Sequence, residues 1–212
     1  MHLARPTTHP TNSTTTTRPF NSWGRQPFIT SVRDGKTPSI TPALTHITQN
    51  FVIANYNSQE AIDNDDASEY FHTTQNVFVY GGNGLKGYFG GHDNTHSHNI
   101  YAFTIGHCVN IGYGHEFFLK GHEDTFTNNK CIMQQAGPYA KIDCSKYGQN
   151  SSSIYADVRL GNNSVFDPAG KPISMCGKPF ATWQQEGFDV GTTLAAIPPS
   201  AQIIGWIHEL LQ

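Results

Sequence analysis

An asparagine followed by a short apolar run recurs five times along this chain. The asparagines are Asn50, Asn76, Asn99, Asn129 and Asn163, at spacings of 26, 23, 30 and 34 residues. Each run favours β-strand, and polar, glycine-containing turns separate the runs. A strand-only repeat of this length is typical of a solenoid, in which each round of chain adds one strand to each of several stacked sheets. We therefore predict an all-β fold, a parallel β-helix of about five coils.

The recurring asparagine has a physical role in such a solenoid. Asparagine tolerates the left-handed backbone conformation that bends a chain between two sheets, so we expect it at those corners. Asparagines stacked in register also hydrogen-bond to one another as a ladder. Shorter second strands are predicted between the runs, over residues 85–89, 109–113 and 140–143. Because the spacing varies, an antiparallel sandwich with asparagine in ordinary turns remains the alternative.

The two ends of the chain differ from the repeats. Residues 1–20 hold seven Thr and three Pro without periodicity, and such a segment buries too little surface to offset the entropy of ordering. We predict a disordered tail over residues 1–20, the β-helix domain over 21–197 and a helix over 198–212. Ser200 is the expected N-cap, and we expect the helix to cover the unpaired edge of the last coil. The apolar positions that fit one face of this helix are Ile203, Ile204, Ile207, Leu210 and Leu211.

Composition excludes several classes of partner. Charged residues are only 14% of the chain and the net charge is −3, which is no footprint of a nucleic-acid-binding protein. No apolar run approaches the roughly 20 residues that cross a bilayer. We therefore expect a monomer without nucleic-acid or membrane partners.

Four cysteines and no CxxC pair make a zinc ribbon improbable and permit two disulfides. We expect Cys144 and Cys176 to close the long loop between them. Cys108 and Cys131 are expected on neighbouring coils as a stacked pair. Disulfides fit a secreted protein, although the first residues show no signal peptide, so we expect a fragment or a misplaced start. Three glycosylation sequons occur, at Asn12, Asn150 and Asn162.

The middle of the chain is acidic and rich in histidine. Residues 60–124 hold nine acids and only two bases, and eight of the 11 histidines fall between His46 and His122. Several of these side chains precede a ladder asparagine by similar distances, so we expect them along one groove. Crowded carboxylates raise one another's pKa or bind a cation, and oxygen ligands without cysteine favour Ca²⁺. The predicted catalytic residues are His92, Asp93, His122 and Asp124, and the predicted calcium ligands are Asp63, Asp65 and Asp66.

Three functions are compatible with this groove. An enzyme would use His92 or His122 as a base, or a carboxylate pair to hydrolyse a glycosidic bond. A carbohydrate-binding module would stack sugar rings on aromatic side chains. A structural turn network would use the acids and histidines only to close turns. The candidate stacking residues are Tyr56, Tyr80, Tyr88, Phe89 and Tyr113.

Several segments resemble a known superfold. They are Trp23-Gly-Arg-Gln-Pro-Phe28, Asn55-Tyr-Asn-Ser-Gln-Glu60, Ile62-Asp-Asn-Asp-Asp66, Gly90-Gly-His-Asp-Asn94, Gly121-His-Glu-Asp124 and Gly187-Phe-Asp-Val-Gly-Thr192. On these residues, roughly 20–212 resemble the C-terminal part of the right-handed parallel β-helix proteins of the pectate-lyase-like superfold, within a poorly characterised group. The resemblance implies a right-handed helix and a secreted protein that acts on, or binds, polysaccharide. Superfolds host many reactions, so it does not imply which one.

The catalytic signatures of the superfold's enzymes are not carried over. Pectate lyases of this fold use an arginine base, and after Arg33 this chain has only Arg159. Polygalacturonases use Gly-His-Gly and Arg-Ile-Lys motifs, and both are absent. We therefore expect a lyase- or glycosidase-like protein, or a non-catalytic module, whose site residues differ from those of pectate lyases and polygalacturonases.

Overall fold

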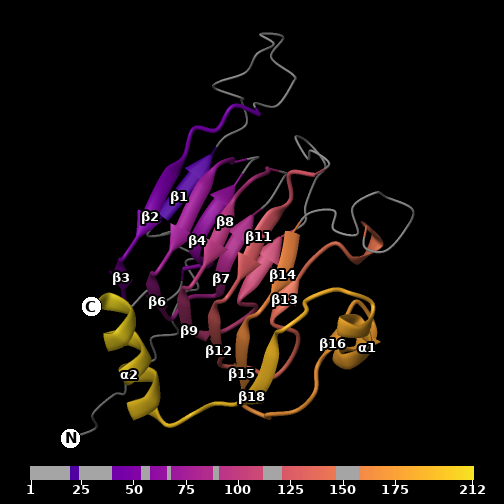
Figure 1. The fold of residues 1–212 in the computed structure, drawn as a ribbon. Coiled ribbons are helices and arrows are strands. Elements are labelled where there is room, and N and C mark those ends of the chain that lie inside the picture. Colours follow the sequence, from indigo (N-terminus) through magenta and orange to yellow (C-terminus); the bar gives the residue numbers. More distant parts are fainter. Residues whose placement is uncertain are drawn as a thin grey trace, which may run out of the picture.

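The computed structural model describes residues 20–23, 40–53, 58–65, 68–87, 91–111, 121–146 and 158–212. Sixteen of the 18 strands in these residues form three parallel sheets, shown in Figure 1. Sheet A contains, in spatial order, β1 (Phe20–Trp23), β4 (Glu60–Asp65), β7 (Asn83–Gly87), β10 (Val109–Ile111) and β13 (Ala140–Lys141). Sheet B contains β2 (Thr45–Thr48), β5 (Phe71–Thr74), β8 (Thr95–Ser97), β11 (Asp124–Thr127) and β14 (Val158–Gly161). Sheet C contains β3 (Phe51–Val52), β6 (Val77–Val79), β9 (Ile100–Thr104), β12 (Lys130–Met133), β15 (Ser164–Asp167) and β18 (Thr193–Ala196).

The chain visits sheets A, B and C in the same order, round after round. Every strand of these three sheets therefore pairs with the strand three places along the chain, and all of these pairs are parallel. This topology is compatible with a parallel β-helix, and it excludes the antiparallel sandwich for the described residues. The predicted strands after each asparagine are confirmed, and so are the starts of the second strands near Leu85, Val109 and Ala140.

The asparagine ladder runs along the corner between sheets B and C. Asn76 donates its backbone N–H to the carboxamide oxygen of Asn99 at 2.9 Å, and its Nδ2 donates to the same oxygen at 3.0 Å. The same pair of bonds joins Asn50 to Asn76, Asn99 to Asn129 and Asn129 to Asn163. The predicted ladder is confirmed, but the predicted left-handed asparagine is wrong, because the preceding residue takes that conformation. Those residues are Gln49, Gln75, His98, Asn128 and Asn162, with φ between 54° and 57°.

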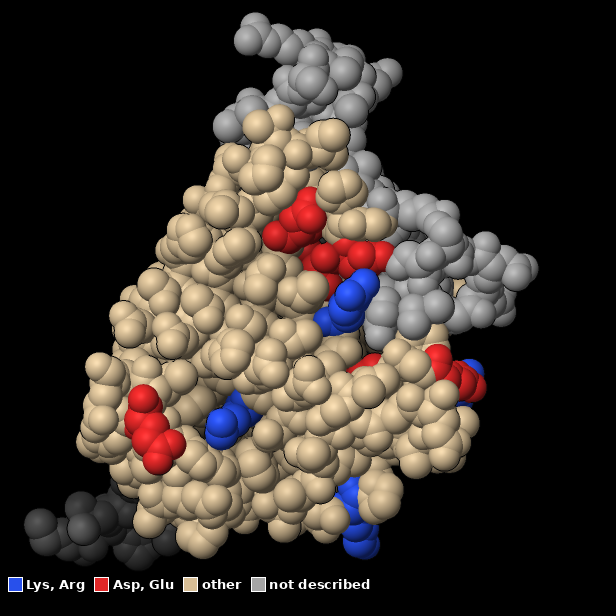
Figure 2. Space-filling model, in the orientation of Figure 1, with Lys and Arg blue, Asp and Glu red and all other residues tan. Residues whose placement is uncertain are grey.

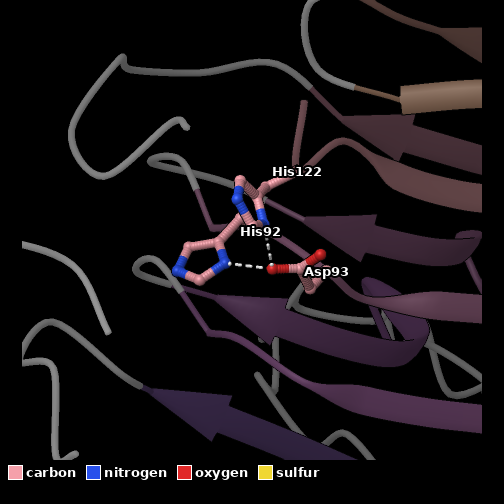
Figure 3. Close-up of side chains that lie close together, drawn as sticks. All are labelled: His92, Asp93 and His122. Atoms are coloured by element: carbon pink, nitrogen blue, oxygen red, sulfur yellow. Dashed lines mark hydrogen bonds and ion pairs between the residues drawn. The ribbon is translucent and has the colours of Figure 1, made fainter. Parts of the chain in front are cut away.

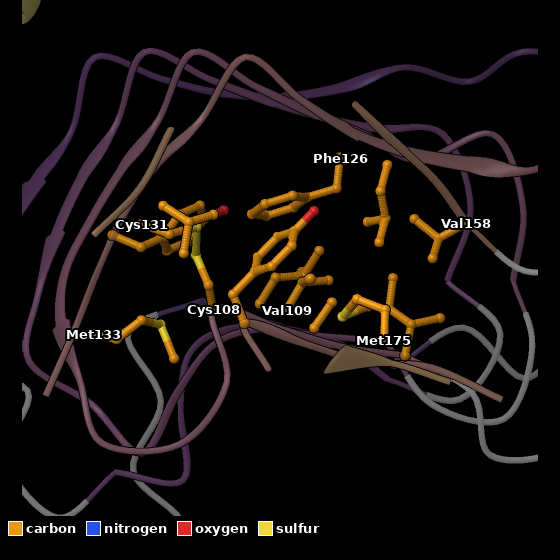
Figure 4. Close-up of a cluster of buried hydrophobic side chains, with 14 of the residues drawn as sticks. Cys108, Val109, Phe126, Cys131, Met133, Val158 and Met175 are labelled. Atoms are coloured by element: carbon orange, nitrogen blue, oxygen red, sulfur yellow. A yellow bond between two sulfur atoms is a disulfide. The ribbon is translucent and has the colours of Figure 1, made fainter. Parts of the chain in front are cut away.

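Inward-facing apolar side chains fill the space that the three sheets enclose, as Figure 4 shows. Tyr101 stacks on Phe78 of the preceding coil, with ring centroids 5.3 Å apart, and contacts Phe126 on the opposite side. Sheet A contributes a row of apolar residues in register. The row is Phe20, Ile62, Leu85, Val109 and Ala140.

Both expected disulfides form. Cys144 and Cys176 close the long loop, with Cα atoms 5.3 Å apart. Cys108 and Cys131 are bonded too, but they are not stacked neighbours in a sheet. Cys108 directly precedes β10 in sheet A, whereas Cys131 lies on β12 in sheet C, so their bond crosses the interior of the stack (Figure 4).

The C-terminal helix forms, but it does not cover the last coil. α2 (Ser200–Leu211) packs on the outer face of sheet C, against Val77, Ile100 and Ile132. Its first turn begins after Pro199, and the predicted Ser200 side-chain cap is absent. No helix among the described residues is long and apolar enough to cross a bilayer.

A different segment closes the C-terminal end of the core. The hairpin of β16 (Ser174–Met175) and β17 (Lys178–Pro179) leads directly into α1 (Phe180–Gln185). The other short helix, the 3-10 helix η1 (Cys144–Lys146), lies between β13 and β14. Trp183 is buried against Phe188, with ring centroids 4.2 Å apart, and both belong to the core cluster. At the opposite end, the first strands of sheets B and C are largely exposed.

Candidate functional site

The turn between sheets A and B places equivalent residues of successive coils side by side. Glu69, His92 and His122 each lie seven residues before a ladder asparagine, and Glu69 and His92 form a parallel β-bridge. Backbone bonds continue this column, since Tyr70 N–H donates to the carbonyl of His92 at 3.4 Å and Asp93 N–H to that of His122 at 3.1 Å. The fold therefore aligns one acid and two imidazoles along the stack.

Asp93 lies between the two histidines. Its Oδ2 is 2.8 Å from Nδ1 of His92 and 2.8 Å from Nδ1 of His122, as Figure 3 shows. Asp93 has a φ of 56°, a left-handed conformation that aspartate tolerates. This conformation ends the turn and brings its carboxylate to the imidazoles of both coils.

His92 is enclosed between two carboxylates. Glu69 Oε2 lies 2.8 Å from Nε2 of His92, and Asp93 Oδ2 lies 2.8 Å from its Nδ1. Burial, the largest effect, lowers the pKa of His92, but the bonds and charges of Glu69 and Asp93 together outweigh it and raise the pKa. A ring with a carboxylate at each nitrogen is best satisfied as imidazolium, because a neutral ring would direct a lone pair at one of them. His92 is wholly buried, so it can orient the neighbouring carboxylates but does not reach a substrate.

His122 is the accessible member of the cluster. Its side chain is 38% exposed, and only Nδ1 is directed at Asp93 (Figure 3). A neutral His122 that donates through Nδ1 carries its lone pair on Nε2. The cluster thus holds one oriented imidazole with a nitrogen available for proton transfer.

Tyr70 supports the cluster from the preceding coil. Its ring meets the edge of His92 at a centroid distance of 5.3 Å. Burial, followed by the charge of Asp93 and a hydrogen bond to it, raises the pKa of Tyr70 to about 12. The phenol therefore stays protonated and donates a hydrogen bond to the Asp93 carboxylate.

The side chain of Asp124 is buried at the start of β11, on the face of sheet B that points toward the core, and does not line an exposed groove. Its Oδ1 accepts the backbone N–H of Asn94 at 2.9 Å, and Asn94 in turn accepts the N–H of Phe71 at 3.0 Å. Burial raises the pKa of Asp124 to about 7, against the opposing hydrogen bonds from Asn94 and the charge of His92. Asp124, predicted as catalytic, therefore ends a second and shorter ladder, in which Phe71 donates to Asn94 and Asn94 donates to Asp124.

The predicted calcium ligands lie on a different sheet. Asp63 and Asp65 are on β4, where Lys86 Nζ lies 3.4 Å from Asp63 Oδ2 and 2.8 Å from Asp65 Oδ2. An ammonium group thus stands between two of the carboxylates proposed to hold the ion. Asp66 lies outside the described residues.

Charged side chains are sparse on the face of the molecule that Figure 2 shows. Figure 2 shows acidic side chains grouped near the upper ends of the sheet B strands, with a Lys or Arg beside them, while most of the visible face is uncharged. Among the predicted sugar-stacking residues, Tyr80 packs on Phe103, with centroids 6.0 Å apart, beside α2. The other stacking candidates, Tyr56, Tyr88, Phe89 and Tyr113, lie outside the described residues.

The structure brings together three of the four predicted catalytic residues, His92, Asp93 and His122. Glu69 was missed, although counting back seven residues from each ladder asparagine places it in one column with both histidines. No family model matches the chain, and no curated protein or solved structure matches it either.

Proposed function

We propose that the protein is a secreted right-handed parallel β-helix that acts on polysaccharide by acid–base catalysis, with His122 as the proton-transfer residue. The observation that carries the proposal is the 2.8 Å contact between Asp93 Oδ2 and His122 Nδ1 on a side chain that is 38% exposed. The parallel three-sheet topology and the two disulfides support the architecture and the extracellular setting.

The chemistry follows from the direction of the hydrogen bond. Asp93 accepts a hydrogen bond from Nδ1–H of His122, so this imidazole presents Nε2 as a base. The Asp93 carboxylate also stabilises the His122 ring when the ring becomes protonated. His92, held as a cation by Glu69 and Asp93, fixes the orientation of the Asp93 carboxylate. Asp93, His92 and Glu69 are therefore positioning residues, and His122 alone reaches the substrate.

A single exposed base fits β-elimination from a uronate better than hydrolysis by two carboxylates. Elimination requires removal of one carbon-bound proton, whereas glycoside hydrolysis uses two carboxyl groups that flank the bond. An acidic surface repels an anionic polymer unless a cation intervenes, so calcium dependence belongs to this proposal. Hydrolysis of a neutral polysaccharide is the competing reaction.

A screen of uronic-acid and neutral polysaccharides, with and without calcium, tests the proposal. Absorbance of an unsaturated product reports elimination, and new reducing ends report hydrolysis. His122→Gln should lower turnover by about 100-fold or more, as removal of a general base does. The matched control is His72→Gln, because His72 lies on the same sheet beside His46, outside the cluster.

The second candidate is a non-catalytic carbohydrate-binding or structural module. It is favoured by the fact that Glu69 and Asp93 already occupy the two ring nitrogens of His92. Unchanged ligand responses and unchanged stability in His122→Gln would select this alternative.

A further inference from the structure

The His92–Asp93–His122 cluster presents three ligand atoms that converge from two coils. Each of the three residues offers one ligand atom, and these atoms all lie within 4.8 Å of one another. The Nδ1 atoms of both histidines lie 2.8 Å from Oδ2 of Asp93. From them we infer a binding site for a divalent first-row transition metal, with zinc as the representative ion. This inference names a ligand of the proposed catalytic cluster, and it is tested without any polysaccharide.

The donor set selects the class of metal. Two imidazole nitrogens and one carboxylate oxygen suit zinc, cobalt or iron(II), whereas calcium takes six to eight oxygen ligands. All four cysteines are in disulfides, so no thiolate competes for the ion. The metal inferred here is thus different in class and place from a calcium ion at Asp63 and Asp65.

Glu69 supplies the outer contact that such sites require. A histidine that binds a metal through one nitrogen is commonly held at the other by a carboxylate, which fixes the ring. Glu69 Oε2 lies 2.8 Å from Nε2 of His92, on the side of the ring away from Asp93. The buried His92 is therefore already aimed with its Nδ1 toward the other two ligand atoms.

The geometry needs only a small expansion. Both Nδ1 atoms are 2.8 Å from Asp93 Oδ2, whereas metal–ligand bonds of 2.0–2.1 Å in a tetrahedron separate ligand atoms by about 3.3 Å. Asp93 and His122 are 28% and 38% exposed, so their side chains can move apart and a water molecule can complete the coordination. Three protein ligands and one open position are typical of catalytic rather than structural metal sites.

Binding changes where the ring protons reside. A metal bound at the Nδ1 of both histidines leaves the remaining proton of each ring on Nε2. The exposed Nε2 of His122 then donates a proton instead of accepting one. Nε2 of His122 would thus act as a base in the metal-free protein and as an acid in the metal-bound protein.

Isothermal titration of chelator-treated protein with zinc tests the inference, and the absorption spectrum of the cobalt form reports nitrogen and oxygen ligands. We expect one ion per chain in the parent and in His72→Gln. Glu69→Gln should weaken binding by about 10–100-fold, as expected of an outer contact, and His122→Gln should weaken it at least as much. Calcium should not displace zinc.

Two outcomes overturn the inference. One is a parent protein that binds no zinc at one ion per chain, and the other is a His122→Gln variant that binds zinc as the parent does. His122 is partly exposed, so this variant should fold, and circular dichroism verifies that. Either outcome leaves the polysaccharide proposal untouched, because the acid–base role of His122 needs no metal.

Discussion

Asp124 Oδ1 accepts the backbone N–H of Asn94 at 2.9 Å, across the boundary between two coils. A carboxylate thus occupies a position where an asparagine would complete the ladder that Asn94 begins. Burial raises the pKa of Asp124 to about 7 from an ordinary value of 3.8. The position therefore favours a neutral side chain that keeps an acceptor oxygen.

We predict that Asp124→Asn stabilises the protein above neutral pH. Because the folded pKa is raised, the parent has its full stability from this group below about pH 4 and loses it as pH rises through about 7. From 1.36 kcal/mol per pKa unit, the gain of the variant is roughly 2–4 kcal/mol at pH 8 and near zero at pH 4. Urea unfolding at both pH values measures it, and a less stable variant at pH 8 would contradict the inward placement.

Glu69→Gln should destabilise the protein in acid more than in base. The raised pKa of His92 means that protonation stabilises the fold below the ordinary histidine value of 6.5, and this contribution is lost as pH rises through the folded pKa. Glutamine cannot supply the charge that holds the imidazolium. We expect a lower melting temperature at pH 5.5 and a much smaller difference at pH 9, and equal differences would show that His92 stays neutral.

The asparagine ladder should be strongest at its centre. Asn99→Ala leaves the buried N–H of Asn76 without its acceptor and removes two donated bonds, so we expect a loss of about 2–5 kcal/mol. Asn50→Ala, at the exposed end, should cost about 1 kcal/mol or less. Chemical denaturation of both variants gives the comparison, and similar losses would mean that the ladder's position does not matter.

The two disulfides should differ in reactivity. Cys108 and Cys131 are fully buried, whereas Cys144 is exposed and closes a span of 32 residues. A mild reductant under native conditions should open Cys144–Cys176 first, at a stability loss of roughly 3–4 kcal/mol in the chain-entropy model. Timed alkylation and peptide mapping follow the order, with the Cys144→Ser, Cys176→Ser double variant as the control. Faster alkylation of Cys108 would show that the core opens readily.

The fold could be predicted where apolar runs mark it. The strands of sheet C follow the ladder asparagines and are apolar on both faces, as in β6, because one face lines the core and the other receives α2. The strands of sheet B carry little of this signal. In β8, Thr95 and Ser97 face away from the core and only His96 is buried, so the segment reads as a polar turn. The amphipathic pattern of α2 predicted its helix but could not say which surface the helix covers.

The site could be predicted from register, and less well from charge. Residues at one offset from the ladder meet across coils, which brought together His92, Asp93 and His122 and would also have found Glu69. Similar but unequal offsets also grouped Asp124, which lies five residues before Asn129, and the acids Asp63 and Asp65 with them. Side-chain direction alternates along a strand, so Asp124 faces inward, while Asp63 and Asp65 are on another sheet beside Lys86. A list of acidic residues does not contain this information.

The ladder gives the molecule a direction. Each asparagine donates its backbone N–H to the next coil in chain order, and the last of them, Asn163, donates to Thr192 Oγ1. Thr192 ends the series, because its own N–H and hydroxyl donate to Asp189, which also accepts the hydroxyl of Tyr139. At the other end, no donor from the described part of the chain contacts the carboxamide oxygen of Asn50.

The two ends of the stack are therefore not interchangeable. A coil that continued the ladder at Asn50 would have to bring donors to that oxygen. Two molecules placed with these ends face to face would oppose oxygen to oxygen. Two placed end to tail would find the donors of Thr192 already engaged. The polarity of a single side-chain type thus distinguishes the two ends of the stack.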